Sequence, residues 1–549
     1  MPTKTFRDAI WGDIEIHDKE IAIVDSKSFQ RLRRIKQLGL AYLVYPCAMH
    51  TRFDHSLGTL SAAQLMVNNL ENNLRREKGV DDSTLKLLKD NIDCIRYFAL
   101  LHDITHIPFG HTMEDEGRLY KRHDDPGSRR WDYYTKEVKD IIPDNIYNTI
   151  TKLLRKDFDK ENKFIYDIVS NTICADLIDY IQRDAYFTGA TGLHFKFDDR
   201  ILKYMTLEYD QKGYLRLVFK PIKDKIRIDV ITDIIQLLRY RYMITERVTF
   251  HHTRCAANAM LIKAIQLLGT SDEDFFYSLG DDDVLYLLSH SKDENVREIA
   301  EMLKNRELFK IVFRVTSSRA PGLKEGSVSL VSQKYGEKDG REELEDRLIS
   351  EITKIPGLNN FEKNHIAIYC PPDEHMNFKE TKVLVRWRSD IPTPLSDIEP
   401  WHNWERLIKD EVEALEEKYK ALWNMHIFVH PKFKRHLYVI EKCCESVLGV
   451  KNDPLLERSF GRSEDYRDYN EYATMLARKE TEIVTIARQI ERGELSFRGL
   501  PTSAGGVKMN REEALNEAIR QVIPPVEKEE EELNYEDKDL RDKKKLKKK

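Results

Sequence analysis

The amino-acid sequence predicts a mainly α protein, in which a helical core carries small β-hairpins and a smaller α+β region follows. Apolar residues recur at helical spacing through most of residues 25–268, which is the pattern of helices that bury one face. Two alternating runs around a glycine, in residues 204–219, are typical of a hairpin. Beyond residue 315, strand-like runs such as "HIAIYCP" and "MHIFVHP" stand between helical stretches. This order favours a helical domain followed by an α+β region.

The first expected elements are short. Residues 4–24 predict two extended segments, the second with some apolar–polar alternation. A helix is expected to begin after Asp25-Ser26 and to end at Gly39, because glycine suits a helix C-cap. Residues 114–130 are polar and rich in turn-forming residues, so we expect a loop there. The other helices are expected near residues 57–73, 92–103, 132–155, 165–187, 226–248, 253–268, 281–289, 293–304, 404–424, 432–448 and 466–493.

The length of the chain predicts more than one domain, because a single hydrophobic core rarely grows to 549 residues. We expect a helical core over residues 1–315 and an α+β region over residues 316–523. Within that region, residues 316–342 are rich in Ser, Gly and Lys and are expected to form a linker. Residues 524–549 are an acidic block followed by a basic one, and they predict a disordered tail.

The composition excludes several classes of protein. A net charge of -5 gives no overall basic excess for nucleic acid, although the terminal "KKKLKKK" could bind it electrostatically. The 7 cysteines form no CxxC pair, which suits a reduced compartment. No apolar run approaches the roughly 20 residues that a bilayer requires, and the N-terminus lacks the apolar stretch of a signal peptide. We therefore expect a cytoplasmic protein without a membrane partner.

Histidines and aspartates gather in an order that suits a metal site. His55 lies in "RFDHS", the pair His102 and Asp103 opens "HDITHIPFGH", and Asp176 opens "DLIDYIQRD". Neutral imidazoles and carboxylates on rigid elements are the ligands that a hydrolytic divalent metal needs. A lone His-Asp pair is common by chance, and a single buried histidine is usually a core residue. Four candidates in supporting contexts favour a metal site.

At these motifs the chain resembles the HD-domain deoxynucleoside triphosphate triphosphohydrolases, in the branch that includes the animal enzymes with a sterile alpha motif. The strings "FQRLRRIKQLGLAYLVYPCAMHTRFDHSLG" and "HDxxHxPFxH" carry the resemblance. It runs from Lys4 to Lys310 and is weaker between His111 and Lys163. The resemblance implies a mainly helical HD domain, a bound divalent metal, and attack of water on the α-phosphorus of a dNTP. The implied products are a deoxynucleoside and inorganic triphosphate.

The resemblance also implies roles for individual residues. One metal ion per active site is implied, and mixed His/Asp ligation leaves Mn, Fe, Zn, Mg and Co open. His106 and His111 would bind phosphate or position water, and His123 would be the acid paired with a carboxylate. Glu114 stands where that carboxylate is usually Asp, and the spacing to His123 is shorter than in the animal branch. The implied metal ligands are His55, His102, Asp103 and Asp176, and the implied catalytic residues are His106, His111, Glu114 and His123.

A substrate-binding face is predicted on the helix over residues 165–187. Asp176, Tyr180, Arg183 and Asp184 fall at helical offsets that place them on one face. The resemblance makes Tyr180 a wall against the sugar, Asp184 and Gln37 acceptors for the 3′-hydroxyl, and Leu38 the residue that crowds the 2′ position; Arg52 and Arg241 would contact phosphates. Two positions depart from the family: Leu177 replaces a phosphate-binding Lys, and Thr249 replaces an aromatic residue.

The animal branch is activated by nucleotides bound between subunits of a tetramer, so the resemblance implies a homo-oligomer, with a tetramer favoured, and a regulatory (d)NTP with Mg. The corresponding positions are Lys4, Asp25, Gln30, Arg33, Arg306 and Lys310. The plainer alternative is that these residues are exposed positions on an ordinary helix and an ordinary strand.

Other functions stay open at this point. An HD-type nuclease or phosphodiesterase, acting on nucleic acid or cyclic nucleotides, could use the same metal site. A nucleotide-sensing scaffold without activity is a second alternative, which the complete set of candidate ligands disfavours. The sequence leaves open which dNTP is consumed, and whether the role is balance of the dNTP pool or antiviral (phage) defence by its depletion.

Overall fold

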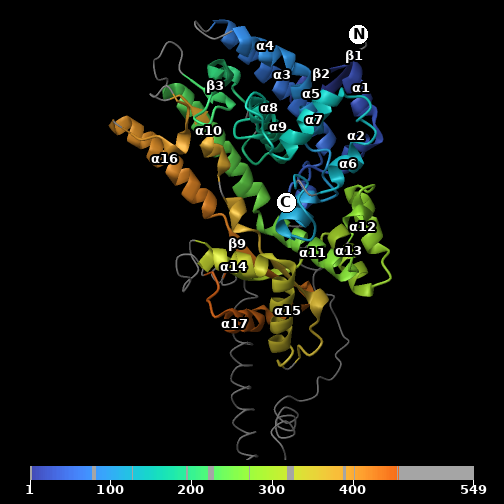
Figure 1. Ribbon diagram of the computed structural model, residues 1–549. Coiled ribbons are helices and arrows are strands. Elements are labelled where there is room, and N and C mark those ends of the chain that lie inside the picture. Colours follow the sequence, from blue (N-terminus) through green and yellow to red (C-terminus); the bar gives the residue numbers. More distant parts are fainter. Residues whose placement is uncertain are drawn as a thin grey trace, which may run out of the picture. The chain divides into compact units, whose positions relative to one another are not determined.

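The computed structural model describes residues 3–76, 82–125, 128–192, 196–220, 228–270, 272–317, 327–355, 357–376, 378–386, 391–400, 402–453 and 456. Residues 1–459 form one compact unit. Within it the fold is mainly α with small sheets, so the predicted fold class is confirmed (Figure 1). The predicted helix over 466–493 and the predicted tail over 524–549 lie outside the described residues. None of the described helices is long and apolar enough to cross a membrane.

The chain begins with a hairpin and continues almost entirely in helices up to residue 304. Strands β1 (Thr3–Asp8) and β2 (Gly12–His17) pair antiparallel, as expected for the first part of residues 4–24, but the last part is helical. The helices that follow are α1 (Asp18–Asp25), α2 (Lys27–Arg31), α3 (Arg52–Arg76), α4 (Asp82–Asp90), α5 (Ile92–Leu101), α6 (Arg130–Tyr134), α7 (Asp144–Leu154), α8 (Lys163–Ser170), α9 (Ala175–Thr188), α10 (Ile228–Ile244), α11 (His252–Leu268), α12 (Asp281–Ser289) and α13 (Glu294–Lys304).

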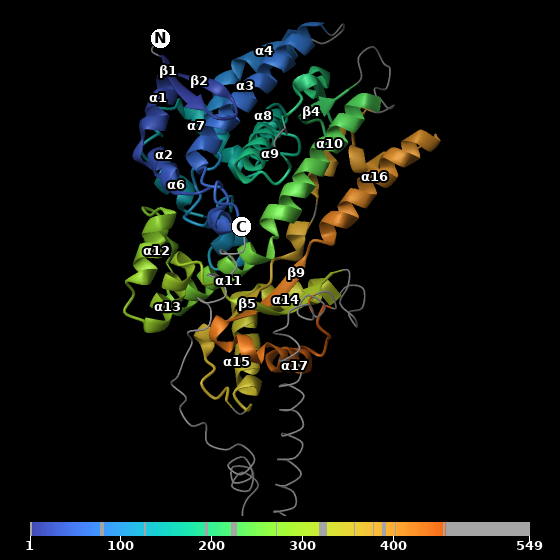
Figure 2. The same cartoon turned by 180° about the vertical axis from the view of Figure 1, so that it is seen from behind.

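The later part of the unit mixes strands and helices, as predicted. Strand β9 (Asn424–Val429) is the centre of an antiparallel sheet and pairs with β5 (Lys310–Thr316) and β6 (Ile366–Tyr369). Helix α11 contacts this sheet, and Figure 2 shows α15 and α17 beyond it. The remaining helices are α14 (Ser327–Gly336), α15 (Lys338–Ile352), α16 (Asn403–Lys420) and α17 (Leu437–Leu448).

The predicted hairpin over residues 204–219 is present and is part of a larger sheet. Strands β3 (Met205–Tyr209) and β4 (Leu215–Phe219) pair antiparallel. The short strands β7 (Leu384–Val385) and β8 (Thr393–Pro394) extend the sheet, with β7 parallel to β4. A segment of the later region therefore pairs with the helical core, and the two regions share one fold.

Two long predicted helices are each divided in the structure. Residues 132–155 form α6 and α7, with turns after Tyr134. Pro143 is the N-cap of α7 and marks its start, because a proline supplies no N–H to a preceding helical turn. Residues 165–187 form α8 and α9, with a break at Cys174, whose extended backbone begins α9 as its N-cap. Because of the second break, α9 begins at Ala175, and Asp176 lies in its first turn.

Two further predictions were wrong in part. The helix expected to reach Gly39 stops at Arg31, and the chain passes through a short 3-10 turn before Lys36 pairs with Thr51. The linker expected over residues 316–342 contains α14 and the start of α15. Helix α14 forms there because Val328, Val331 and Tyr335 recur at helical spacing and pack on the second hydrophobic core.

The site depends on the close crossing of α3 and α9. Both helices bury long apolar stretches, and α3 also packs against α5. At the crossing, α3 carries Gly58, and a side chain there would overlap the carboxylate of Asp179 and the guanidinium of Arg183. Glycine costs a helix interior about 1 kcal/mol. That cost is accepted here because only glycine leaves room for the polar groups of α9.

We predict that Gly58→Ala destabilises the protein although alanine favours the helix. The methyl group would displace a buried ion pair, and overpacking alone costs about 1–3 kcal/mol. Urea denaturation should therefore show a net loss of about 2 kcal/mol in the free energy of unfolding. Ser61→Ala, one turn further along α3 and half-exposed, is the matched control and should change stability by less than about 0.5 kcal/mol. A Gly58→Ala protein as stable as the control would contradict this account.

Candidate metal centre and active-site cavity

Four candidate metal ligands converge from three elements. His55 lies in the first turn of α3, His102 and Asp103 follow α5 directly, and Asp176 lies in the first turn of α9. The His55 Nε2 atom is 3.3 Å from His102 Nε2, 3.2 Å from Asp176 Oδ1 and 3.8 Å from Asp103 Oδ2. His102 Nε2 is 3.7 Å from Asp103 Oδ1. The structure thus brings together the residues that the sequence suggested as ligands.

The other nitrogen of each imidazole is already engaged. His102 Nδ1 lies 2.8 Å from the carbonyl oxygen of Ala99, and His55 Nδ1 lies 2.8 Å from Asp179 Oδ2. Both partners are acceptors, so the proton of a neutral ring sits on Nδ1 and the Nε2 lone pair faces the cluster. This arrangement is the usual support for metal-bound histidines. In this fold, both Nδ1 atoms are held by acceptors, so both Nε2 atoms face the position that a cation would occupy.

Asp179 is the residue that sequence reasoning missed. It is fully buried, and it accepts hydrogen bonds from Trp11 Nε1 at 2.6 Å and from Arg183 Nε at 2.9 Å. Arg183 also pairs with Asp8 at 2.8 Å. The prediction that Arg183 shares the cavity face of α9 was therefore wrong, because it turns toward the N-terminal hairpin. The available signal was the spacing of the two carboxylates in "DLID", three residues apart on one helix.

Neighbouring charged groups shift the pKa values of His55 and Asp103 in the cluster. Burial lowers the pKa of His55, but hydrogen bonds to Asp176 and Asp179 outweigh burial and raise it to about 10. Burial raises the pKa of Asp103, but the Arg52 guanidinium, whose Nη1 is 2.6 Å away, and a hydrogen bond from His106 hold it well below its usual range. The carboxylates therefore stabilise positive charge at the His55 ring, and a cation bound at Nε2 would take the place of the ring's second proton.

The donor set fits a divalent cation. His55, His102 and Asp103 can each offer one ligand atom, and these atoms all lie within 4.8 Å of one another. Asp176 adds a second carboxylate at 3.2 Å from His55. Two imidazoles with two carboxylates suit several first-row metals and Mg²⁺, so the chemistry of the ligands leaves the metal open.

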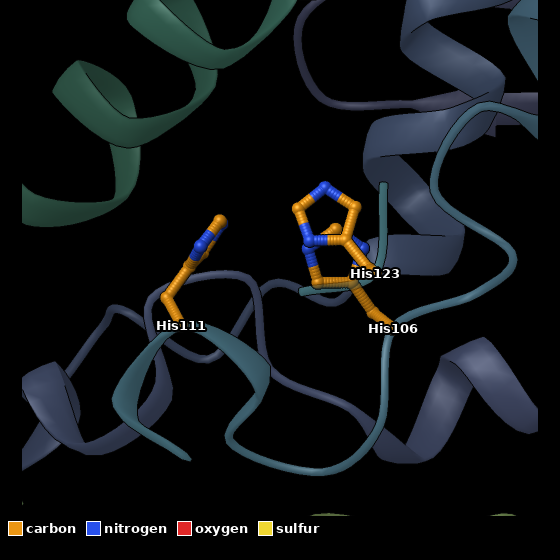
Figure 3. Close-up of side chains that lie close together, drawn as sticks. All are labelled: His106, His111 and His123. Carbon is orange, nitrogen blue, oxygen red and sulfur yellow. The ribbon is translucent and has the colours of Figure 1, made fainter. Parts of the chain in front are cut away.

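A second cluster holds the three histidines that were predicted to be catalytic. His106 and His123 stack with ring centroids 3.6 Å apart, and His111 stands 5.0 Å from His106 (Figure 3). Helix α5 ends at Leu101, so His106 reaches the site from a loop and not from a further helical turn. Arg31 holds that loop, because it donates to the carbonyl oxygens of Ile104 and His106 at 2.8 Å.

The predicted acid–carboxylate pair is also brought together. His123 Nδ1 lies 2.9 Å from Glu114 Oε2, and Arg130 pairs with the other oxygen of Glu114. Burial raises the pKa of Glu114, but His123 and Arg130 outweigh it and lower the pKa. Burial, with Arg52 and His123, lowers the pKa of His106 well below its usual range, so this ring stays neutral. His111 is tied to Asp115 at 2.8 Å.

A cavity of about 500 Å³ joins the two clusters to the predicted sugar contacts. The His106 Nε2 atom and the Gln37 Oε1 atom are buried without a hydrogen-bond partner among the described residues. Asp184 is buried and lies 2.8 Å from His50 Nε2, a support that the sequence did not suggest. The lining includes all the predicted substrate contacts, namely Gln37, Leu38, Arg52, Tyr180, Asp184 and Arg241.

The cavity is lined by the two predicted arginines and by further cations. Arg52 is engaged by Asp103, and Arg241 pairs with Tyr180 and, at 2.9 Å, with Glu380. Three further cations line the cavity and were not foreseen: Arg122, Lys156 and Lys379. Lys379 comes from the later region of the chain, far in sequence from the helical core. No local sequence pattern could have placed it there.

The six suggested regulatory positions lie in separate groups. Lys4 and Asp25 pair at 2.8 Å, and Arg33 donates to Gln30 at 2.9 Å while its guanidinium covers the ring of Phe53. Arg306 donates to the carbonyl oxygen of Leu43 at 2.7 Å, and Lys310 is an exposed residue at the start of β5. Lys4, Asp25, Arg33, Arg306 and Lys310 are exposed, and Gln30 is half-buried.

Comparison with protein families identifies two regions. The HD domain matches residues 52–184, and the HD associated region matches residues 231–459. The first contains the four candidate ligands and the three clustered histidines. The second begins in α10 and includes the sheet around β9.

Several relatives have similar sequences. An uncharacterized protein of Bacillus subtilis is 30% identical over 341 residues, which cover 56% of this chain and 72% of that protein. A deoxynucleoside triphosphate triphosphohydrolase SAMHD1 homolog of Dictyostelium discoideum is 28% identical, with 58% and 61% covered. An uncharacterized protein of Methanocaldococcus jannaschii is 33% identical, but the match spans only 49% of its length. A solved structure of a hypothetical protein from Aquifex aeolicus shares the fold, with a TM-score of 0.56, 21% identity, and 80% of this chain and 100% of that chain covered.

We predict that Asp179→Asn weakens metal binding without removing a ligand. The amide carries no negative charge and fixes the His55 ring less well, so metal affinity should fall about 10–100-fold. Titration with Mn²⁺ against a competing chelator measures this affinity, and circular dichroism confirms folding. Asp132→Asn, at an exposed position of α6, is the matched control and should bind metal as the wild type does. Unchanged affinity in a folded Asp179→Asn protein would rule out this role.

Proposed function

The chain belongs to the HD-domain family of metal-dependent phosphohydrolases, and from this premise we propose that it cleaves a dNTP to a deoxynucleoside and inorganic triphosphate. One observation carries the proposal. The candidate metal ligands stand at one end of a cavity whose lining continues to Gln37, Leu38, Tyr180 and Asp184. A cavity of about 500 Å³ accommodates a nucleotide. The relatives named as SAMHD1 support the same substrate class.

The proposed reaction is attack of water on the α-phosphorus with cleavage of the bond to the 5′ oxygen. A divalent cation held by His55, His102, Asp103 and Asp176 would offset the phosphate charge and acidify water. The neutral His106 can accept a hydrogen bond at its free Nε2 and so orient the attacking water.

His123 is positioned to supply the proton that the leaving 5′ oxygen needs. The ionised Glu114 lies 2.9 Å from His123 Nδ1 and so orients the ring, and His123 lines the cavity. The triphosphate carries several negative charges, and Arg122, Lys156 and Lys379 line the same cavity. Leu177 occupies the position of the family lysine, so we infer that these three cations replace its charge.

The sugar end of the cavity supports a preference for deoxynucleotides. Asp184, fixed by His50, and the unpartnered Gln37 oxygen can both accept from a 3′-hydroxyl. Leu38 offers only apolar atoms, so a 2′-hydroxyl against it would lose water without gaining a partner. Activation by a regulatory nucleotide and assembly into an oligomer, with the six positions from Lys4 to Lys310 between subunits, belong to the same proposal.

The direct test is product analysis with each dNTP alone and with all four together, in Mn²⁺ or Mg²⁺. We expect deoxynucleoside and triphosphate in equal amounts, and turnover only in the mixture would indicate activation by a second nucleotide. His102→Ala should lower kcat by at least about 10³-fold, because a ligand to the metal is lost. Asp132→Asn serves again as the control. Cleavage of oligonucleotides or cyclic dinucleotides in place of dNTPs would favour the nuclease or phosphodiesterase alternative.

A second prediction concerns the sugar. Leu38→Ala should raise the kcat/KM for ribonucleotides relative to deoxynucleotides by about tenfold, because the 2′-hydroxyl then meets space and water. The ratio is measured with matched pairs such as dATP and ATP. Leu287→Ala, at an exposed position of α12, is the control. If the ratio stays at the wild-type value, Leu38 is not the residue that refuses ribonucleotides.

A further inference from the structure

A second cavity of about 460 Å³ continues from the first. Both cavities are lined by Gln37, Leu38, Tyr180 and Asp184, the proposed sugar contacts. The first cavity leads from these residues to the metal ligands and therefore suits the phosphates. The second shares Arg52, Arg122, Arg241 and Lys379 with the first but is lined by none of the metal ligands. It extends instead to Glu116, Arg254 and Tyr369, where the base of a bound nucleotide would lie. A base pocket in the second cavity rests on the proposed function.

A buried cluster of three polar side chains lies at the wall of the second cavity. Glu116 ends the short helical turn after His111, and Arg254 and Asn258 lie one turn apart on α11. Arg254 Nη1 donates to Glu116 Oε1 at 3.0 Å, and Asn258 Nδ2 donates to Glu116 Oε2 at 2.6 Å. Glu116 and Arg254 both line the cavity, and their exposed fractions are only 7% and 6%.

The hydrogen bonds among Glu116, Arg254 and Asn258 leave some of their polar atoms without a partner in the part of the chain that the structure describes. Arg254 Nε and Asn258 Oδ1 are buried and have no hydrogen-bond partner among the described residues. The hydroxyl of Tyr369, from the end of β6, is buried beside the Cys255 thiol and lines the same cavity. Buried polar atoms without partners cost free energy. Arg254 and Tyr369 line the cavity, so a polar ligand there could pair with their buried atoms.

The Glu116–Arg254 pair offers a carboxylate beside a guanidinium. A carboxylate accepts from two adjacent N–H donors, and a guanidinium donates to carbonyl or ring nitrogen acceptors. Guanine presents N1–H next to its 2-amino group, and O6 next to N7. Arginine is the usual partner of O6 and N7 in other guanine contacts.

The other bases match less well. Thymine sets its one ring N–H between two carbonyl oxygens, which a carboxylate repels. Adenine and cytosine each present a single amino group, and their adjacent ring nitrogen carries no proton. An aromatic surface for stacking is available from Phe250, which also lines this cavity and follows the Thr249 that departs from the family.

We propose that Glu116 and Arg254 select a guanine base, so that this chain hydrolyses dGTP in preference to the other three deoxynucleotides. Because Tyr369 and Arg254 lie within the HD associated region, that region supplies part of the base pocket. Glu116 comes from the HD domain, so the two regions would read the base together.

The test is a competition assay with the full-length protein, the metal, and all four dNTPs at equal concentration. Relative rates of consumption give ratios of kcat/KM, and any activation by one nucleotide acts on all four alike. The wild type should consume dGTP at least about tenfold faster than each of the others. It should also consume dGTP about tenfold faster than dITP, which lacks the 2-amino group. These two results require no variant and so do not depend on how a substitution folds.

Glu116→Gln then tests the residue. Its amide offers a donor where guanine also offers donors, so the advantage of dGTP should fall about tenfold or more while the other three rates relative to one another stay within about threefold. Glu294→Gln, exposed on α13, is the control. Equal rates for the four dNTPs in the wild type, or an unchanged preference in Glu116→Gln, would overturn the inference alone. No consumption of any dNTP by the metal-loaded wild type would overturn the proposed function as well.

Discussion

The pairing of the His55 imidazole with the buried carboxylate of Asp179 is the contact on which this site depends. It fixes the ring so that Nε2 faces the other three candidate ligands. The contact requires α3 and α9 to cross closely, and the glycine at residue 58 permits that approach. Trp11 and Arg183 then donate to the carboxylate from the other side, and Asp8 holds Arg183 in place. The N-terminal hairpin therefore supports the metal centre although it contributes no ligand.

The cavity is built from both matched regions. The HD domain supplies the ligands, the clustered histidines, Tyr180 and Asp184. The segment before it supplies Gln37 and Leu38, and the later region supplies Lys379, Glu380 and Tyr369. Cations line both cavities, whereas the candidate metal ligands line only the first and the Glu116–Arg254 pair lines only the second. Under the proposed function, the metal ligands would lie at the phosphates of a dNTP, and the Glu116–Arg254 pair would recognise its base by hydrogen bonds.

The sequence was most informative where chemistry and local spacing coincide. The fold class and the convergence of His55, His102, Asp103 and Asp176 could be predicted, because their motifs are specific. Helix ends were less predictable, since Pro143 and Cys174 break patterns whose apolar spacing continues across them. Partners far apart in the chain could not be predicted at all. Asp8 with Arg183, and Lys379 over the cavity, depend on tertiary packing that no local pattern records.

The central claim is that water attacks the α-phosphorus and that the bond to the 5′ oxygen breaks. Hydrolysis in ¹⁸O-labelled water tests it most directly, with mass spectrometry of both products. The account predicts one labelled oxygen in the inorganic triphosphate and none in the deoxynucleoside. A labelled deoxynucleoside would place the attack on carbon, and a labelled monophosphate or pyrophosphate would place the cleavage at another bond; either result would contradict the account.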